Sequence, residues 1–117
     1  MVPFQVNIAG VILAAGQSSR FGQPKQLLPW GKRNMLNTCI ATAKNAMLSP
    51  IVVVLGAHSE EILPEMDQEG VEVVINHHWA EGQSTSVKAG VSALPEDVYG
   101  AVFLLADQPQ ISVQLIV

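Results

Sequence analysis

The fold is decided by an apolar run and the loop behind it, which together read I-A-G-V-I-L-A-A-G-Q-S-S-R-F-G-Q-P-K from position 8 to position 25. Apolar residues do not alternate with polar ones over residues 8–15, a pattern typical of strands covered on both faces in a parallel sheet. Runs of the same kind follow at residues 51–56, 71–75 and 101–106. The sequence therefore predicts four buried strands.

The segments between these runs are predicted to be helical. Residues 34–48 place apolar side chains three and four positions apart, at Leu36, Cys39, Ile40, Ala43 and Met47, and Pro50 ends the segment. On this face Cys39 is expected to pack rather than to act as a nucleophile. Residues 83–94 keep the same spacing, with Ser84 as the expected N-cap and Pro95 as terminator. Residues 59–66 predict a shorter helix, because Pro64 interrupts it.

Strands and helices alternate along the chain, which predicts a Rossmann-like α/β fold, a three-layer sandwich with a mainly parallel sheet. In such folds ligands bind beyond the carboxyl ends of the strands. Four segments would lie there, at residues 14–25, 56–59, 76–86 and 107–109. They hold most of the polar residues that could carry chemistry.

Composition excludes several classes of protein. The 117 residues are 49% apolar and 14% charged, which fits one compact domain and excludes intrinsic disorder. No apolar run reaches the roughly 18 residues of a membrane span. The single cysteine cannot form an internal disulfide, and the first seven residues lack the features of a signal peptide. We expect a cytoplasmic location.

The charges are distributed unevenly along the chain. The net charge of −4 argues against a nucleic-acid or anionic-membrane surface. However, residues 1–59 contain no Asp or Glu and five of the six Lys and Arg residues, whereas residues 60–117 contain all ten acids. Four basic residues fall between positions 20 and 33, so the sequence predicts a local site for a small anion. A solvated basic loop is the alternative.

The first loop has the residue types of a phosphate site. Ala14, Ala15 and Gly16 are small enough for a ligand to lie against the backbone N–H groups. Ser18 and its neighbour Ser19 add hydroxyl donors, and the cations Arg20 and Lys25 suit a chain of phosphates better than a single carboxylate. The loop matches neither the G-x-G-x-x-G pattern nor a P-loop. The alternative is a glycine turn that carries two surface cations.

Two further segments supply candidate ligands. Asp107 follows a buried strand, where its carboxylate could hold Mg²⁺ together with substrate phosphates; the alternative is a cap of the turn before Pro109. Ser84, Thr85 and Ser86 open a helix whose hydroxyl and N–H groups could bind phosphate or a nucleobase edge. The adjacent His77 and His78 do not have the spacing of a metal site.

Three stretches then match a known family: V-I-L-A-A-G-Q-S-S-R-F-G-Q-P-K-Q-L-L-P-W, N-H-H-W-A-E-G-Q-S-T-S-V-K-A-G and L-L-A-D-Q-P. Together they closely resemble the MobA-like NTP transferases, and within them the molybdenum cofactor cytidylyltransferases. The resemblance implies transfer of CMP from CTP to molybdopterin with release of pyrophosphate, and a molybdoenzyme as a further partner. The pair Ala15-Gly16 resembles the cytidylyl branch, whereas guanylyl enzymes usually carry Gly-Gly.

The resemblance also implies roles for individual residues. The backbone from Leu13 to Gly16 would line the nucleotide, Arg20 and Lys25 would hold the triphosphate, and Asp107 would bind Mg²⁺. Three side chains, Gln83, Ser84 and Ser86, would face the base or ribose. No general base is required, since the attacking phosphate oxygen is already ionised at neutral pH.

The family's domain is longer than this chain, so residues 1–117 are expected to form the N-terminal nucleotide-binding part of a nucleotidyltransferase domain, in a fragment or truncated product. The strand at residues 101–106 is then expected to have an uncovered edge. Two alternative functions remain. One is a cytidylyltransferase for an isoprenoid or sugar phosphate, and the other is a nucleotide-binding or partner-binding module without turnover.

Overall fold

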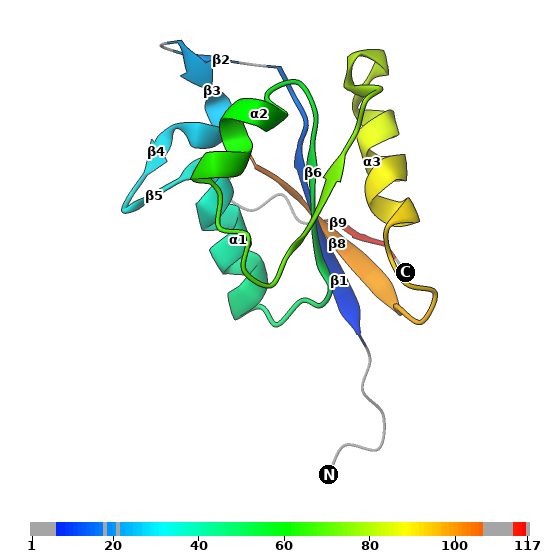
Figure 1. Cartoon of the computed structure of the whole chain (residues 1–117). Helices are drawn as coiled ribbons and strands as arrows, with labels where there is room; N and C mark the ends of the chain where they lie inside the picture. Colours follow the sequence, from blue (N-terminus) through cyan, green and yellow to red (C-terminus); the bar gives the residue numbers. More distant parts are fainter. Residues whose placement is uncertain (1–6, 18, 21, 107–113, 117) are drawn as a thin grey trace.

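A five-stranded sheet forms the centre of the molecule (Figure 1). The computed structural model describes residues 7–17, 19–20, 22–106 and 114–116. The strands follow the order β7-β6-β1-β8-β9 across the sheet. Four are parallel, namely β1 (Ile8–Ala14), β6 (Ile51–Leu55), β7 (Glu72–Ile75) and β8 (Gly100–Leu105), while β9 (Gln114–Ile116) runs antiparallel to β8. The four strands predicted from the apolar runs are confirmed.

Three helices cover the two faces of the sheet (Figure 1). On one side lie α1 (Met35–Asn45) and α2 (Ser59–Ile62), the latter continued by the 3-10 helix η2 (Leu63–Glu65). On the other side lies α3 (Gln83–Ser92). Successive strand residues point to opposite faces, so Ile12 packs with α1 and α2 whereas Val11 packs beneath α3. The predicted three-layer sandwich is confirmed.

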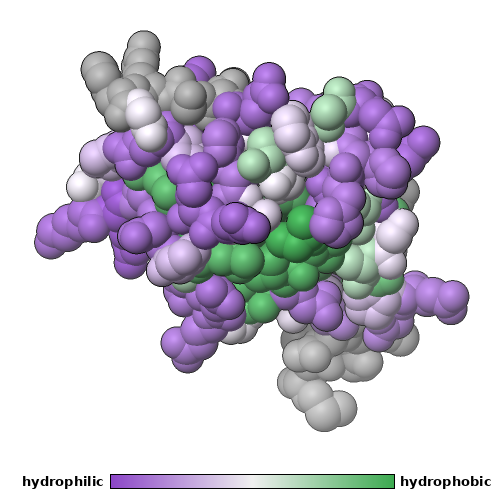
Figure 2. All heavy atoms as spheres, turned by 45° about the horizontal axis from the view of Figure 1, so that its top comes forward, coloured by the Kyte–Doolittle hydropathy of each residue, from purple (hydrophilic) through white to green (hydrophobic). Residues whose placement is uncertain are grey.

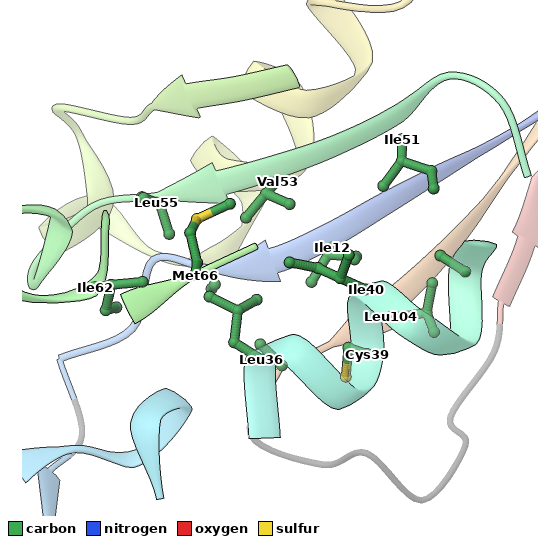
Figure 3. Close-up of a cluster of buried hydrophobic side chains, with 13 residues drawn as sticks. Ile12, Leu36, Cys39, Ile40, Ile51, Val53, Leu55, Ile62, Met66 and Leu104 are labelled. Carbon is green, nitrogen blue, oxygen red and sulfur yellow. The ribbon is translucent and has the colours of Figure 1, made fainter. Parts of the chain in front are cut away.

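The layer between the sheet and α1 holds most of the large buried side chains (Figure 3). Leu36, Cys39 and Ile40 from α1 meet Ile12 and Val53 from the sheet, and each is at most 2% exposed. The expectation that Cys39 packs in the core is confirmed by this burial. The helix begins where Asn34 accepts a hydrogen bond of 2.7 Å from the Asn37 N–H, which satisfies one of the unpaired donors of the first turn.

Helix α3 begins differently from the prediction. Gly82, not Ser84, occupies the N-cap position, with φ at 119°, a value that side chains strongly disfavour. The 3-10 helix η3 (Trp79–Glu81) leads directly into it. Ser84 is exposed within the first turn. The expected N-cap was therefore wrong, because the chain enters the helix from a turn that only glycine adopts readily.

Short elements between β1 and α1 were not predicted. These are the hairpin of β2 (Ser19–Arg20) and β3 (Gln23–Pro24), the 3-10 helix η1 (Lys25–Leu27), and the hairpin of β4 (Pro29–Trp30) and β5 (Arg33–Asn34). The expected uncovered edge was wrong for part of β8, because β9 pairs with it from Ala101 to Phe103. None of the described helices is long and apolar enough to cross a membrane.

Candidate nucleotide site

A cavity of about 160 Å³ lies at the carboxyl ends of β1 and β8. Its lining comes from six places in the chain: β1, the turn after it, η1, η3, the start of α3 and the end of β8. The residues are Leu13, Ala15, Gly16, Lys25, Gln26, Trp79, Gln83, Ser86 and Leu105. In Figure 2, where this end of the sheet is tilted towards the viewer, polar side chains cover most of the face and leave an apolar area between them.

The cavity brings together most of the residues predicted to bind the nucleotide. Leu13, Ala15, Gly16, Lys25, Gln83 and Ser86 all line it. Gly16 is exposed and Lys25 is half-buried, so a backbone turn and an ammonium group are both accessible from the same space. These six residues come from the first two of the three motifs, and their shared role in binding a nucleotide stays a prediction.

Two predicted residues do not line the cavity. Ala14 is buried on the opposite face of the sheet, in the layer with α1, and only its backbone carbonyl belongs to the turn. Ser84 is exposed on α3 away from the lining. The period-two alternation of a strand explains the first case, and the first-turn geometry of α3 explains the second.

The remaining predicted residues cannot be placed in the cavity. Ser18 and Asp107 lie outside the described residues, and Arg20 is described only through the backbone of β2. The last described residue before Asp107 is Ala106, whose N–H donates a hydrogen bond of 3.1 Å to the carbonyl of Leu13. The predicted opposition of Arg20 and Lys25 to Asp107 thus stays a prediction.

A network beneath the start of α3 orients the hydroxyl of Ser86. The Asn76 side chain is 4% exposed, and its Nδ2 donates to Ser86 Oγ and to Thr85 Oγ1, both at 2.9 Å. Asn76 Oδ1 accepts a 2.9 Å bond from the N–H of His78, so the amide cannot be turned over without losing these contacts. Because Ser86 Oγ accepts from Asn76, its own proton can be donated to a group in the cavity.

The turn after β1 is fixed by partners on all sides. The carbonyls of Ala14 and Gly16 accept from Gln26 Nε2, that of Ala15 accepts from the Ala57 N–H, and that of Gln17 lies 2.8 Å from His58 Nε2. With its carbonyls engaged in this way, the turn can offer its N–H groups to a ligand. Backbone N–H groups that are free to donate are what an anion-binding turn requires.

Gly56 allows the two walls of the cavity to approach each other. A Cβ atom at this position would lie 2.9 Å from the Cβ atoms of both Ala15 and Trp79. Real Cβ atoms do not approach so closely, so any larger residue would displace the turn or the η3 wall.

Sequence reasoning missed three lining residues, Gln26, Trp79 and Leu105. Trp79 stood within the motif that was quoted for the family, but no pattern distinguished it from a core residue. Gln26 carried a stronger signal, since it is a polar residue inside the apolar segment that follows Lys25. Within the described residues no group of three His, Cys, Asp or Glu could hold a metal ion alone.

Residues 10–117 match the MobA-like NTP transferase domain. The chain belongs to this family. The resemblance stated from the three motifs is therefore confirmed. The chain shares its fold with Rv0371c from Mycobacterium tuberculosis. The crystal structure of Rv0371c matches with a TM-score of 0.79 at 33% identity, and the match covers 91% of this chain and 54% of that one. A complex of Rv0371c with manganese matches with a TM-score of 0.76 at 28% identity, over 92% and 54% of the two chains.

Curated relatives carry more than one name. The Nicotine blue oxidoreductase of Paenarthrobacter nicotinovorans is 35% identical over 107 residues, which are 91% of this chain and 52% of that protein. The Molybdenum cofactor cytidylyltransferase of Escherichia coli (strain K12) is 40% identical over 87 residues, 72% of this chain and 44% of that protein. The chain spans about half the length of the curated relatives it matches.

Proposed function

We propose that this MobA-like chain is the nucleotide-binding part of a divalent-metal-dependent cytidylyltransferase that transfers CMP from CTP to molybdopterin and releases pyrophosphate. The observation that carries the proposal is that the small-residue turn, Lys25 and Ser86 line the same cavity. The first two groups suit a polyphosphate and the third suits a base or ribose, so one nucleotide would satisfy all of them.

Each described group has a distinct role in this proposal. The N–H groups of the turn and the ammonium of Lys25 would neutralise the triphosphate and the charge that develops on the leaving pyrophosphate. Ser86, held by Asn76, would donate its proton to an acceptor on the base or ribose. Cytosine offers such acceptors at its carbonyl and ring nitrogen. The order Ala15-Gly16 and the cytidylyltransferase relative support CTP as the nucleotide.

The attacking group needs little help from the protein. A phosphate monoester has a second pKa of about 6, so its oxygen is ionised at neutral pH and no side chain must act as a base. Catalysis then depends on bringing two anions together and on stabilising charge. Lys25 and, as we propose, Arg20 supply the fixed positive charge.

Asp107 is proposed as a ligand of Mg²⁺ or a similar divalent ion. In proteins Mg²⁺ is commonly held by one or two carboxylates together with substrate phosphates. When bound, the ion would neutralise phosphate charge and align the two phosphates. The manganese complex of Rv0371c supports the use of a divalent metal within the family. A cytoplasmic location and a molybdoenzyme partner belong to the same proposal.

Calorimetric titration with CTP and Mg²⁺ tests the nucleotide site. Lys25→Ala is expected to weaken binding by about 1.5 to 3 kcal/mol, the scale of a hydrogen bond to a charged group. Lys88→Ala is the matched control, because Lys88 is exposed on α3 and does not line the cavity. Equal affinities of the Lys25 variant and the unchanged chain would remove Lys25 from the site.

Asp107→Asn tests the metal ligand. The variant is expected to bind CTP equally well with and without Mg²⁺, because the carboxylate that holds the ion is lost. Titrations with and without Mg²⁺ in the same buffer measure this dependence. If the variant still requires magnesium, the ligand lies elsewhere in the chain.

The alternative function is nucleotide binding without turnover. Pyrophosphate release from CTP, Mg²⁺ and molybdopterin distinguishes the two functions. No release from this chain, together with release from a version extended to the relatives' length, would assign it binding alone. Replacing molybdopterin by isoprenoid or sugar phosphates tests the alternative acceptors in the same assay.

A further inference from the structure

Gln26 is a buried polar residue at the junction of two parts of the cavity. It lies in η1 directly after Lys25, and it is 4% exposed. Its Nε2 donates to the carbonyl of Ala14 at 2.9 Å and to the carbonyl of Gly16 at 3.1 Å. One side-chain amide therefore links the helix that carries Lys25 to the turn that follows β1.

The two bonds fix the amide in one orientation. Carbonyl oxygens accept hydrogen bonds only, so the NH₂ group must face Ala14 and Gly16. Gln26 Oε1 is buried and has no hydrogen-bond partner among the described residues. The side chain is thus held through its donors alone, and a buried acceptor without a partner has a cost. The fold tolerates this cost because the two hydrogen bonds that Gln26 Nε2 donates hold the turn in place.

The consequence for the cavity is electrostatic. A carbonyl oxygen that faced the cavity would repel a phosphate, whereas an N–H group attracts one. Gln26 engages the carbonyls on both sides of Ala15, and the Ala57 N–H engages that of Ala15 itself at 3.1 Å. Three successive carbonyl oxygens beside Lys25 thus accept hydrogen bonds from protein donors, which compensate their partial negative charges.

We propose that Gln26 is a positioning residue for anion binding in this cavity. Its amide holds the turn at residues 14–16 in the conformation that offers N–H groups, and it sets the distance between this turn and the ammonium of Lys25. Gln26 acts through these contacts, since its side-chain amide already donates to two carbonyls. The proposal rests on the proposed function in one respect, namely that the anion is the polyphosphate of a nucleotide.

Variants of nearly equal size separate the donor function from packing. Gln26→Met keeps the length of the side chain but removes both donors. Gln26→Glu removes them and places a carboxylate oxygen against two carbonyls, which is more severe. Acidification should partly restore the thermal stability of the Glu variant, since the protonated acid regains one O–H donor. Gln23→Glu is the matched control for charge, because Gln23 is exposed two residues before Lys25.

Binding of CTP with Mg²⁺, measured by calorimetry, gives the first result. Gln26→Met is expected to weaken binding about tenfold, which corresponds to about one hydrogen bond. A positioning residue acts through its neighbours, so the same substitution in a Lys25→Ala background should cost clearly less than tenfold. A residue that only stabilises the fold would lower the melting temperature and leave the affinity of the folded protein unchanged, which would overturn the proposal.

Amide hydrogen exchange in the ligand-free protein gives the second result, which does not depend on any nucleotide. The Ala57 N–H reports on the turn, because it donates to the Ala15 carbonyl at 3.1 Å. Its exchange should accelerate in Gln26→Met and Gln26→Glu but not in Gln23→Glu, while exchange in β6 stays as it was. Unchanged exchange at Ala57 would overturn the proposal even if CTP binds. If the unchanged chain fails to bind CTP but the turn loosens as expected, the proposed function fails and the positioning of the turn by Gln26 stands.

Discussion

Two glycines, Gly16 in the cavity lining and Gly56 behind Ala15 and Trp79, have opposite constraints. A Cβ atom at Gly56 would contact Ala15 and Trp79 at 2.9 Å, whereas a Cβ atom at Gly16 would meet nothing within 4 Å. Gly16 also has no left-handed backbone angle that would exclude a side chain. The fold therefore requires glycine at position 56 but not at position 16. The proposed ligand gives a reason for glycine at position 16.

Gly16→Ala is accordingly expected to separate stability from binding. The free energy of unfolding should stay the same or rise by up to about 1 kcal/mol, because alanine restricts the unfolded chain. Binding of CTP with Mg²⁺ should weaken, since the new methyl group occupies space beside the turn. Urea unfolding and calorimetry measure the two effects.

Gly56→Ala is the matched comparison for this experiment. It is expected to lower the free energy of unfolding by about 1 to 3 kcal/mol, the usual cost of an overpacked site. If Gly16→Ala binds CTP as well as the unchanged chain does, the ligand does not approach the turn.

The contact between α3 and the sheet is close because of another glycine. A Cβ atom at Gly90 would lie 2.6 Å from Val11 Cγ1 and 3.2 Å from Val54 Cγ2. The helix thus packs directly on β1 and β6. Because Ser86 lies one turn before Gly90, this contact also fixes the distance of Ser86 from the strands. A helix interior usually favours alanine over glycine by about 1 kcal/mol, so here packing outweighs propensity.

Gly90→Ala should therefore destabilise the protein by about 1 to 3 kcal/mol, despite the better helix propensity of alanine. Urea unfolding gives the value, and Ser92→Ala, at an exposed position of the same helix, provides the control. Val11→Ala should cost less stability in the Gly90→Ala background than in the unchanged chain, because it makes room for the new methyl group. A Gly90→Ala variant that is more stable than the unchanged chain would contradict the close packing.

The sequence predicted long elements better than short ones. The four parallel strands are uninterrupted apolar runs, and α1 has apolar residues three and four positions apart. These two patterns identified the elements and placed Cys39 in the core. The hairpins β2–β3 and β4–β5 have two residues in each strand, too few for any periodicity. Ser84 was chosen as a cap by residue type, but the backbone of Gly82 decided where α3 begins.

The residues of the candidate site were likewise predictable only in part. Lys25, Gly16 and Ser86 lie at strand or helix ends, where the topology of a parallel sheet collects side chains, and their meeting in one cavity was predictable. The polar residue type of Gln26 beside an apolar segment was a signal, but its role was not predictable, because that role depends on two backbone carbonyls that approach it only after folding. The residue types in a sequence do not show in which direction a backbone carbonyl points.

At the scale of the whole molecule, the acid-free first half and the acidic second half of the chain meet on the surface beside α1. Lys44 Nζ lies 3.0 Å from Asp67 Oδ2, and both side chains remain partly exposed. The hydrogen bond from Lys44 and a second one from the Glu69 N–H hold the pKa of Asp67 below its ordinary value. The folded state therefore favours the ionised form of this carboxyl group.

The pH dependence of stability follows from the lowered pKa of Asp67. A carboxyl group with a lowered pKa stabilises the fold above its unfolded pKa, and this contribution is lost as the pH falls through the lower, folded value. Asp67→Asn should reduce stability at neutral pH by no more than about 1 kcal/mol, because exposed ion pairs are weak. Chemical unfolding of both proteins, repeated at strongly acidic pH and in high salt, should show the difference disappear. A difference that persists in strong acid would assign the effect to another cause.

The order of the strands also bears on how the chain emerges from a ribosome. β1 is made first, yet it lies between β6, which begins at Ile51, and β8, which begins at Gly100. A nascent chain can close one side of β1 early, but the other side stays open until nearly all of these residues have been synthesised. Pairing over such long separations is slow and leaves an apolar strand edge exposed meanwhile. Chaperone dependence during translation is the expected consequence of placing the first strand at the centre.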